Sequence, residues 1–219
     1  MNEVAPGVWR MSGIIPCLIN VYLIRTTRGE VLIDAGMRWM AGGLVRALRG
    51  RPLAMVALTH VHPDHQGAAH AICTRRCVPL ACHEADADVM EGRRRVGPPT
   101  WLVSLADMAW SGPAHPVSVR WKGGESLGEW EVIHAPGHTA GHVIYFRRSD
   151  GVAVAGDVLR NASLRGGFGR LAHTPDAFNE SPAGARQAVR ILHGLRPSLL
   201  CLGHGPPSRD VDRLARLAG

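Results

Sequence analysis

The amino-acid sequence predicts an α/β fold built from two similar halves, each a β-sheet covered by helices on one side. In both halves, short apolar segments bounded by glycine and proline precede segments whose apolar residues recur at helical spacing. No linker or low-complexity stretch interrupts the chain. We therefore expect residues 1–219 to form a single domain. It is large enough to bury a hydrophobic core without stabilisation by disulfide bonds or structural metal ions.

The first half begins with short strands and then alternates strands with helices. Strands are expected over residues 7–13, 20–26, 30–36, 53–60 and 78–82. Helices are expected over residues 38–50, 66–73 and 83–90. Residues 91–116 are rich in Gly, Pro and Arg and have weak periodicity, which indicates a loop or a short helical excursion.

The second half consists mainly of strands and ends with helices. Strands are expected over residues 117–121, 129–136, 142–148, 151–157 and 197–205. Helices are expected over residues 181–195 and 210–217, with Ser181 as the N-cap and Pro182 at the first helical position. Residues 161–176 contain three glycines and are expected to be a mobile loop.

The composition is that of a soluble globular protein, with 46% hydrophobic and 20% charged residues. No apolar run approaches membrane-spanning length, and the first residues lack a charged leader followed by an apolar segment. The five cysteines have no framework spacing, which favours free thiols in a reducing compartment. We therefore expect a cytoplasmic protein with no membrane partner.

The formal charge is +7, and arginine supplies nearly all of the positive charge because Lys122 is the only lysine. Guanidinium groups bind carboxylates and phosphates, so nucleic acid, an anionic small molecule or plain solubility would each account for the excess. A solvated basic surface is the simplest of these interpretations. The net charge alone therefore does not indicate which partner the protein binds.

Polar residues follow apolar strands at several places in the chain. His60 follows MVALT, Asp157 follows VAVAG and His204 follows LLCLG. His138 follows VIHAPG in the same way. Imidazoles and carboxylates without cysteine are the donors that suit Zn(II), Fe or Mn. Six or seven such ligands are too many for one tetrahedral zinc and suit two ions, about 3.5–4 Å apart, that share a bridging carboxylate.

Four motifs resemble, in order, those of the metallo-β-lactamase-fold hydrolases. They are THVHPDH at 59–65, APGHTAGH at 135–142, VAGD at 154–157 and LGHG at 202–205. LIDAG at 32–36 also resembles the N-terminal strand and turn of that family. The resemblance spans nearly the whole chain. It implies an αββα four-layer sandwich, in which two mixed sheets are flanked by helices and the site lies at one edge of the sheets.

The same resemblance implies two divalent ions, with zinc favoured and iron or manganese as alternatives. The implied ligands are His60, His62 and His138 for the first ion, Asp64, His65 and His204 for the second, and Asp157 as the bridge. Asp34 and His142 would orient ligands without touching a metal. The alternative role for Asp64 is that it only caps the helix that follows.

Resemblance to the glyoxalase II branch implies hydrolysis of an acyl bond, in a thioester or another ester, by metal-bound hydroxide. Asp64 would act in catalysis by orienting that hydroxide. Glyoxalase II has a C-terminal helical domain that grips glutathione. Only residues 205–219 follow His204, so we expect that domain to be missing and glutathione specificity to be lost with it.

Other branches of the family match less well. Lactonases of this fold have a tyrosine where this chain has Arg160, and well-known β-lactamases have a cysteine where it has Asp157. No stretch is long enough for the insertion or arm that nuclease members carry, so a nucleic-acid substrate is not expected. Three alternatives stay open: a persulfide dioxygenase with one iron on His60, His138 and Asp157, a lactonase, and a non-catalytic scaffold stabilised by metal.

Three arginines follow the bridging aspartate: Arg160, Arg165 and Arg170. If this segment rims the pocket, Arg160 and Arg165 would hold an anionic group of the substrate through bidentate hydrogen bonds. His173 is a further candidate contact. We therefore expect a small-molecule substrate, with an anionic tail as one option. A homodimer is compatible with the sequence, which does not decide the oligomeric state.

Overall fold

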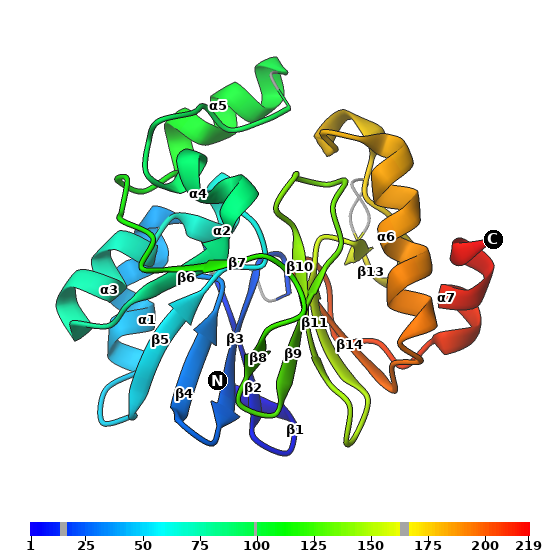
Figure 1. Ribbon diagram of the computed structural model, residues 1–219, viewed down its shortest axis with the longest axis horizontal. Helices are drawn as coiled ribbons and strands as arrows, with labels where there is room; N and C mark the ends of the chain where they lie inside the picture. The colour runs from blue at the N-terminus through cyan, green and yellow to red at the C-terminus, as the bar shows by residue number, and fades with distance from the viewer. Residues whose placement is uncertain (14–16, 99, 163–166) are drawn as a thin grey trace.

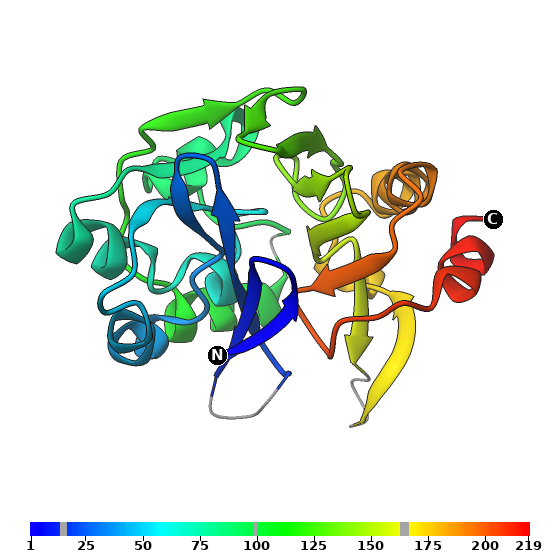
Figure 2. The ribbon, with the colours of Figure 1, turned by 90° about the horizontal axis from the view of Figure 1, so that it is seen from below.

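The computed structural model describes residues 1–13, 17–98, 100–162 and 167–219. Its two largest sheets lie side by side in the middle of the molecule, with helices on the outer side of each (Figure 1). Figure 2 shows the same layers from below, with the C-terminal helices beyond the second sheet. This arrangement confirms the αββα sandwich that the sequence resemblance implied.

The first sheet has seven strands, which follow one another in chain order. They are β1 (Asn2–Ala5), β2 (Val8–Ser12), β3 (Asn20–Thr26), β4 (Gly29–Ile33), β5 (Leu53–Ala57), β6 (Leu80–His83) and β7 (Val119–Trp121). The pairs from β1 to β4 are antiparallel and those from β4 to β7 are parallel, so the sheet is mixed. β1 was not expected from the sequence. It is a short edge strand that turns back into β2 through Gly7, at φ +70°.

The second sheet has five strands in the order β14-β11-β10-β9-β8. They are β8 (Ser126–Leu127), β9 (Trp130–His134), β10 (Val143–Arg147), β11 (Val152–Gly156) and β14 (Leu199–Leu202). Only the pairing of β11 with β14 is parallel. The crossover between these two strands contains the helix that covers this sheet.

Helices account for both outer layers and for the connections near the site. On the side of the first sheet they are η1 (Arg38–Met40), α1 (Ala41–Ala47), α2 (Pro63–Gln66), α3 (Ala69–Arg76), α4 (Glu84–Met90) and α5 (Trp101–Trp110). On the side of the second sheet they are η2 (Asp176–Phe178), α6 (Pro182–Gly194) and α7 (Val211–Ala218). Over the described residues, every helix is too short or too polar to cross a membrane.

The start of α6 confirms the capping expected from the sequence. The Ser181 hydroxyl accepts a hydrogen bond from the Gly184 N–H, and Pro182 is the first helical residue. The buried residues of α6 are Ala188, Val189 and Leu192, at the spacing of one helix face. That face packs on the second sheet.

Three apolar clusters fill the three interfaces between the four layers. The central cluster joins the two sheets, and its largest fully buried side chains are Tyr22, Trp130 and Tyr145. The outer clusters lie between each sheet and its own helices. Because both sheets contribute to the central cluster, neither half would keep its core alone. We therefore propose that residues 1–219 form a single domain.

Residues 161–176 differ from the mobile loop expected there. β12 (Leu159–Ala162) pairs antiparallel with β13 (Phe168–His173), with Leu159 opposite His173. Leu159 and Leu171 are buried in the cluster beneath α6 and α7. Burial alternates along β12, and Leu171 is the buried residue of β13, while the glycines conceal these strands in the sequence. Residues 163–166, between the two strands, lie outside the described part of the chain.

Candidate metal centre

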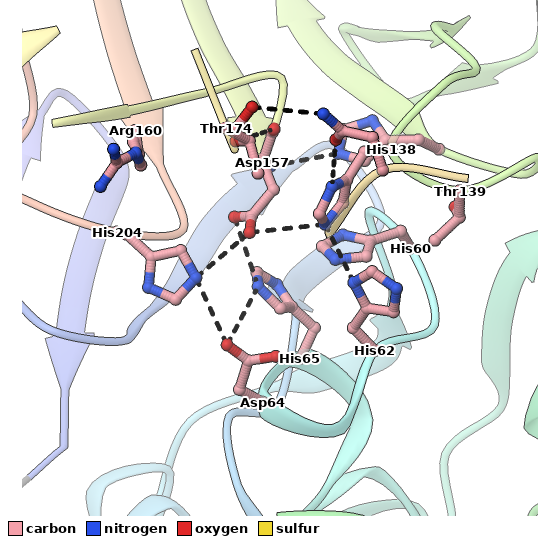
Figure 3. A network of polar contacts seen from close by, with 12 residues as sticks. His60, His62, Asp64, His65, His138, Thr139, Asp157, Arg160, Thr174 and His204 are labelled. Atoms are coloured by element: carbon pink, nitrogen blue, oxygen red, sulfur yellow. Dashed lines mark hydrogen bonds and ion pairs between the residues drawn. The ribbon is translucent and has the colours of Figure 1, made fainter. Parts of the chain in front are cut away.

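The seven expected ligands come from four loops at the same edge of the two sheets (Figure 3). His60, His62, Asp64 and His65 follow β5, and His138 lies between β9 and β10. Asp157 and His204 directly follow the ends of β11 and β14. Segments separated by up to 144 positions, from His60 to His204, therefore meet in one place. Strand ends of neighbouring sheets produce this convergence.

The ligand atoms form a first group, His60, His62 and His138, within 4.8 Å of one another. His62 Nδ1 lies 2.9 Å from His138 Nε2. His62 Nε2 donates to the Gly97 carbonyl at 2.7 Å, so its Nδ1 has a free lone pair. His138 Nδ1 donates to Asn179 Oδ1 at 2.9 Å, so its Nε2 also has one. Two lone pairs at this distance repel each other unless a cation lies between them.

His60 completes this group. Its Nδ1 lies 3.0 Å from the Thr59 hydroxyl, which in turn donates to Asp34. The hydroxyl therefore accepts from Nδ1–H, and the remaining Nε2 of His60 points a lone pair into the site. All three imidazoles thus present an unprotonated nitrogen, as metal ligands do.

The second group consists of Asp64, His65 and His204. His65 Nδ1 donates to Asp34 Oδ2 at 2.9 Å, and His204 Nδ1 donates to the Leu18 carbonyl at 2.6 Å. The Nε2 atom of His204 lies 3.3 Å from Asp64 Oδ2. Each imidazole is therefore oriented through one nitrogen and free to bind a cation through the other.

Asp157 lies between the two groups. Its Oδ1 is 3.4 Å from His65 Nε2, and its Oδ2 is 3.1 Å from His204 Nε2 and 3.6 Å from His138 Nε2. Its N–H donates to Nε2 of His142 at 3.1 Å. A carboxylate in contact with both sets of ligands is placed to bridge two ions.

Gly156 allows this close approach of strand β11 to the ligand loops. Its φ of +47° favours glycine, and an added Cβ would lie 2.6 Å from the Thr59 hydroxyl and 2.8 Å from His142 Nε2. The glycine of the VAGD motif is therefore required by space as well as by backbone conformation.

The two groups differ in their electrostatics. Burial, and then the neighbouring His65, hold the pKa of His60 well below its ordinary value, and burial followed by His62 lowers the pKa of His138 to about 3. For His65, burial acts in the opposite direction, but the carboxylates of Asp157 and Asp34 raise the pKa well above its ordinary value. In the first group the pKa values of His60 and His138 are thus lowered, whereas the second group is built around carboxylates.

Three buried polar atoms of these residues test whether cations fit. His60 Nε2, His65 Nε2 and Asp157 Oδ1 are buried and make no hydrogen bond within the described structure. Leaving a buried polar atom without a partner costs about 1–3 kcal/mol. Divalent cations bound to the free imidazole and carboxylate atoms would remove that cost. The residues present therefore fit a metal centre of nitrogen and oxygen donors.

Asp34 is the residue that connects the ligand loop to the first sheet. It accepts from the Thr59 N–H at 2.8 Å and from the Thr59 hydroxyl, and it also holds His65. Asp34 adopts φ +62°, a left-handed conformation that short polar residues tolerate. Asp34 therefore contacts both Thr59 and His65 from the end of the first sheet.

Asp86 on α4 was missed in the sequence and connects two ligand loops. Its Oδ2 accepts from the Val61 N–H at 3.1 Å and from the Thr139 hydroxyl at 2.7 Å, and its Oδ1 accepts from the Gly141 N–H at 2.8 Å. The side chain is 1% exposed although it is acidic. Asp86 and the buried Met90 stand at positions i and i+4 of α4 and so lie on the same face of the helix. This spacing is the signal that would have placed Asp86 on the inner face.

Removing the Asp86 carboxylate is expected to destabilise the protein. Asp86→Ala leaves three buried donors without an acceptor, so we expect a loss of about 3 kcal/mol in the free energy of unfolding. Asp88→Ala is the matched control on the same helix, because the Asp88 side chain is 56% exposed. Chemical denaturation measures both, and equal stabilities of the two variants would contradict the role given to Asp86.

Asn179, which follows η2, was also missed. Its Oδ1 accepts from His138, and its Nδ2 donates to the Thr174 carbonyl at 3.2 Å. It thereby fixes which nitrogen of His138 faces the site. An asparagine after a short 3-10 turn carries no motif, so only its position in space identifies this role.

The three candidate substrate contacts are placed differently. Arg160 borders the site (Figure 3), but its Nε donates to the His173 carbonyl at 3.1 Å and its Nη1 to the Ala162 carbonyl at 2.8 Å. Two of its three nitrogens thus hold the β12–β13 hairpin together. His173 ends β13 and is not among the described residues that line the cavity beside the metal ligands. Arg165 lies outside the described residues.

Asp64 does not cap the helix that it belongs to. The N-cap of α2 is His62, and Pro63 is the first helical residue. Asp64 instead borders a cavity of about 320 Å³ that opens beside the ligands. A carboxylate facing this cavity is accessible to water and to a substrate.

Comparisons with known proteins point to one protein family. The sequence profile described as "Metallo-beta-lactamase superfamily" matches residues 14–204. The chain is 31% identical over 230 residues to the probable metallo-hydrolase YflN of Bacillus subtilis (strain 168), covering 94% of this chain and 86% of that protein. It is 32% identical over 161 residues to a hydroxyacylglutathione hydrolase of Halorhodospira halophila, covering 73% of this chain and 50% of that protein.

A solved structure extends the similarity to three dimensions. The crystal structure of TTHA1623 in a di-iron-bound form matches with a TM-score of 0.69 and 28% identity, and the match covers 94% of this chain and 96% of that one. The profile match covers all seven expected ligands, from His60 to His204. The chain therefore belongs to the metallo-beta-lactamase superfamily.

Proposed function

We propose that this protein is a hydrolase that uses two metal ions to cleave an acyl bond, in a thioester or another ester. The observation that carries the proposal is the convergence of free imidazole and carboxylate atoms on two adjacent groups that share Asp157. The first ion would be held by His60, His62 and His138, the second by Asp64, His65 and His204, and Asp157 would bridge them. The similarity to a hydroxyacylglutathione hydrolase, over half of that protein, supports acyl chemistry.

Two divalent cations, when bound, supply Lewis acidity for the substrate carbonyl and make water acidic enough to ionise near neutral pH. The protein supplies the rest. Asp34, Asn179 and the Leu18 carbonyl orient imidazoles so that the correct nitrogen faces the site. Asp64 borders the cavity, where its carboxylate would orient a water molecule and accept its proton. His142 supports Asp157 through the backbone N–H.

Zinc is the metal we propose, and iron and manganese are its alternatives because the same nitrogen and oxygen donors bind all three. The di-iron form of TTHA1623 supports iron as the first alternative to test. A centre with a single iron on His60, His138 and Asp157 would instead favour the dioxygenase reaction. The number and identity of the bound ions therefore separate the two enzymatic readings.

The partner we propose is a small molecule, because the cavity beside the ligands has the size of a small-molecule site. A nucleic-acid substrate is not proposed. A cytoplasmic location and a homodimer stay predictions from the sequence.

Metal analysis followed by a substrate panel tests the proposed function. We expect protein purified without added metal to contain two ions per chain, as measured by plasma mass spectrometry. On a panel of thioesters, esters, lactones, β-lactams and bis-p-nitrophenyl phosphate, the thioesters or esters should be hydrolysed fastest. Hydrolysis of the phosphodiester alone, or one iron per chain with no hydrolysis, would contradict the proposal.

A further inference from the structure

The cavity beside the metal ligands has apolar walls. One wall is α5, through Val103, Ala106 and Trp110, and the opposite wall includes Ala162 and Phe178. Leu18, Ile19, Met37 and Pro175 also line it. Its polar lining consists mainly of ligand residues at one end. The cavity therefore combines a reactive polar end with an apolar body.

Thr174 and Arg160 line the cavity without being expected ligands, and both side chains already make hydrogen bonds within the protein. The Thr174 hydroxyl donates to the Asp157 carbonyl at 2.9 Å. Arg160 donates through Nε and Nη1 to backbone carbonyls of its own hairpin. A polar group of a substrate placed among these walls would thus lose hydrogen bonds to water and gain few in return.

Helix α5 is fixed with respect to the ligand helix α2. Just beyond α5, the backbone of Gly112 passes so close to Gly67 that an added Cβ would lie 2.0 Å from the Gly67 oxygen. Trp110 also contacts Trp39 edge to face, with ring centroids 6.4 Å apart. The apolar wall is therefore built at a set distance from Asp64, and its shape selects what fits beside the reacting carbonyl.

We propose that the acyl group of the substrate is a short to medium apolar chain without a hydroxyl next to the carbonyl, and that it binds between α5 and the β12–β13 side of the cavity. This inference rests on the proposed function and names its substrate class. The carbonyl lies at the metal ligands and the chain extends along Val103, Ala106 and Phe178. The cavity volume of about 320 Å³ is at the lower end for small-molecule sites, which limits the chain length.

Acyl thioesters of one common thiol, from acetyl to octanoyl, test the proposal. We expect kcat/KM to rise about fourfold per methylene, which corresponds to about 0.8 kcal/mol, until the cavity is full. A 2-hydroxyacyl thioester should react about tenfold more slowly than the matched acyl thioester, because its hydroxyl is buried without a partner. A flat profile, or a preference for the hydroxyacyl thioester, would overturn the proposal.

Binding without catalysis gives a second readout. Calorimetric titration with 1-alkanols from butanol to octanol should show a dissociation constant that falls about fourfold per methylene. If alkanols bind in this graded way but no acyl compound is hydrolysed, the proposed function is wrong and the apolar cavity stands. If thioesters are hydrolysed without any dependence on chain length and alkanols do not bind, the proposed function stands and the apolar acyl site is wrong.

Two variants of the same helix locate the effect. Ala106→Trp fills the cavity, so the preferred acyl chain should become shorter and octanoyl turnover should fall about tenfold relative to wild type. Leu105→Trp is the matched control, since Leu105 is 55% exposed on the outer face of α5. Its chain-length profile should equal that of wild type. An Ala106→Trp variant with an unchanged profile would place the acyl chain elsewhere.

Discussion

Asp157→Ala is expected to abolish metal binding and hydrolysis together. The Asp157 carboxylate contacts His65, His138 and His204 and so reaches members of both ligand groups. Its loss would remove one proposed ligand from each proposed ion, and with it the negative charge that would lie between the two ions. Several kcal/mol of transition-state stabilisation depend on the metals, so kcat/KM should fall by about 1,000-fold or more.

Asp176→Ala provides the control for this experiment. Asp176 lies on η2, and its side chain is 62% exposed and paired only with Arg186, also exposed. The same substitution there should leave metal content and kcat/KM close to wild type. Metal analysis and thermal melting of both variants show whether Asp157→Ala loses metal from a folded chain. Two retained ions and full activity in that variant would refute the bridging role.

Much of the proposed ligand set could be predicted from the sequence because its residues follow apolar runs. His60, Asp157 and His204 each follow a continuous apolar run, and such runs are buried strands whose ends reach the edge of a sheet. The apolar run before each of these three residues therefore indicated that the residue lies at the end of a buried strand. The grouping into two metal sites came from the family resemblance, since spacing in the sequence does not report distances between loops.

The residues that hold the proposed ligands in place could be predicted from the sequence only in part. Asp34 belongs to a motif and was expected, whereas Asp86 and Asn179 belong to none. Their roles depend on α4 and η2 being packed against loops that lie 25 to 55 positions away. A polar residue that satisfies distant backbone groups has the same local sequence signature as one exposed to water.

The two walls of the cavity show a second limit of sequence reasoning. α5 lies in a stretch with weak periodicity because apolar residues occur on both of its faces: Val103 faces inward, while Trp101 and Met108 are exposed. The β12–β13 hairpin was obscured by its glycines. Segments that form a substrate site are shaped by the ligand as well as by the core, so they show the folding pattern less clearly.

Asp64→Asn is expected to lower the turnover number by about 100-fold or more while the fold survives. Asparagine keeps the size of the side chain but removes the charge that faces His204 Nε2 at 3.3 Å. It also removes the base that would accept a proton from water. Because Asp64 borders the cavity and is not the N-cap of α2, the helix loses no capping interaction. The ester or thioester found in the substrate panel supplies the assay.

Comparison of turnover, metal content and melting temperature in this variant separates a catalytic centre from a structural one. A structural metal site has no need of an open position, so in a scaffold stabilised by metal the replacement of Asp64 would leave every tested activity unchanged while the fold survives. A hydrolase would lose turnover, and the second ion would bind more weakly because Asp64 is one of the three residues proposed to hold it besides Asp157. Unchanged turnover at unchanged melting temperature would exclude Asp64 as a catalytic residue.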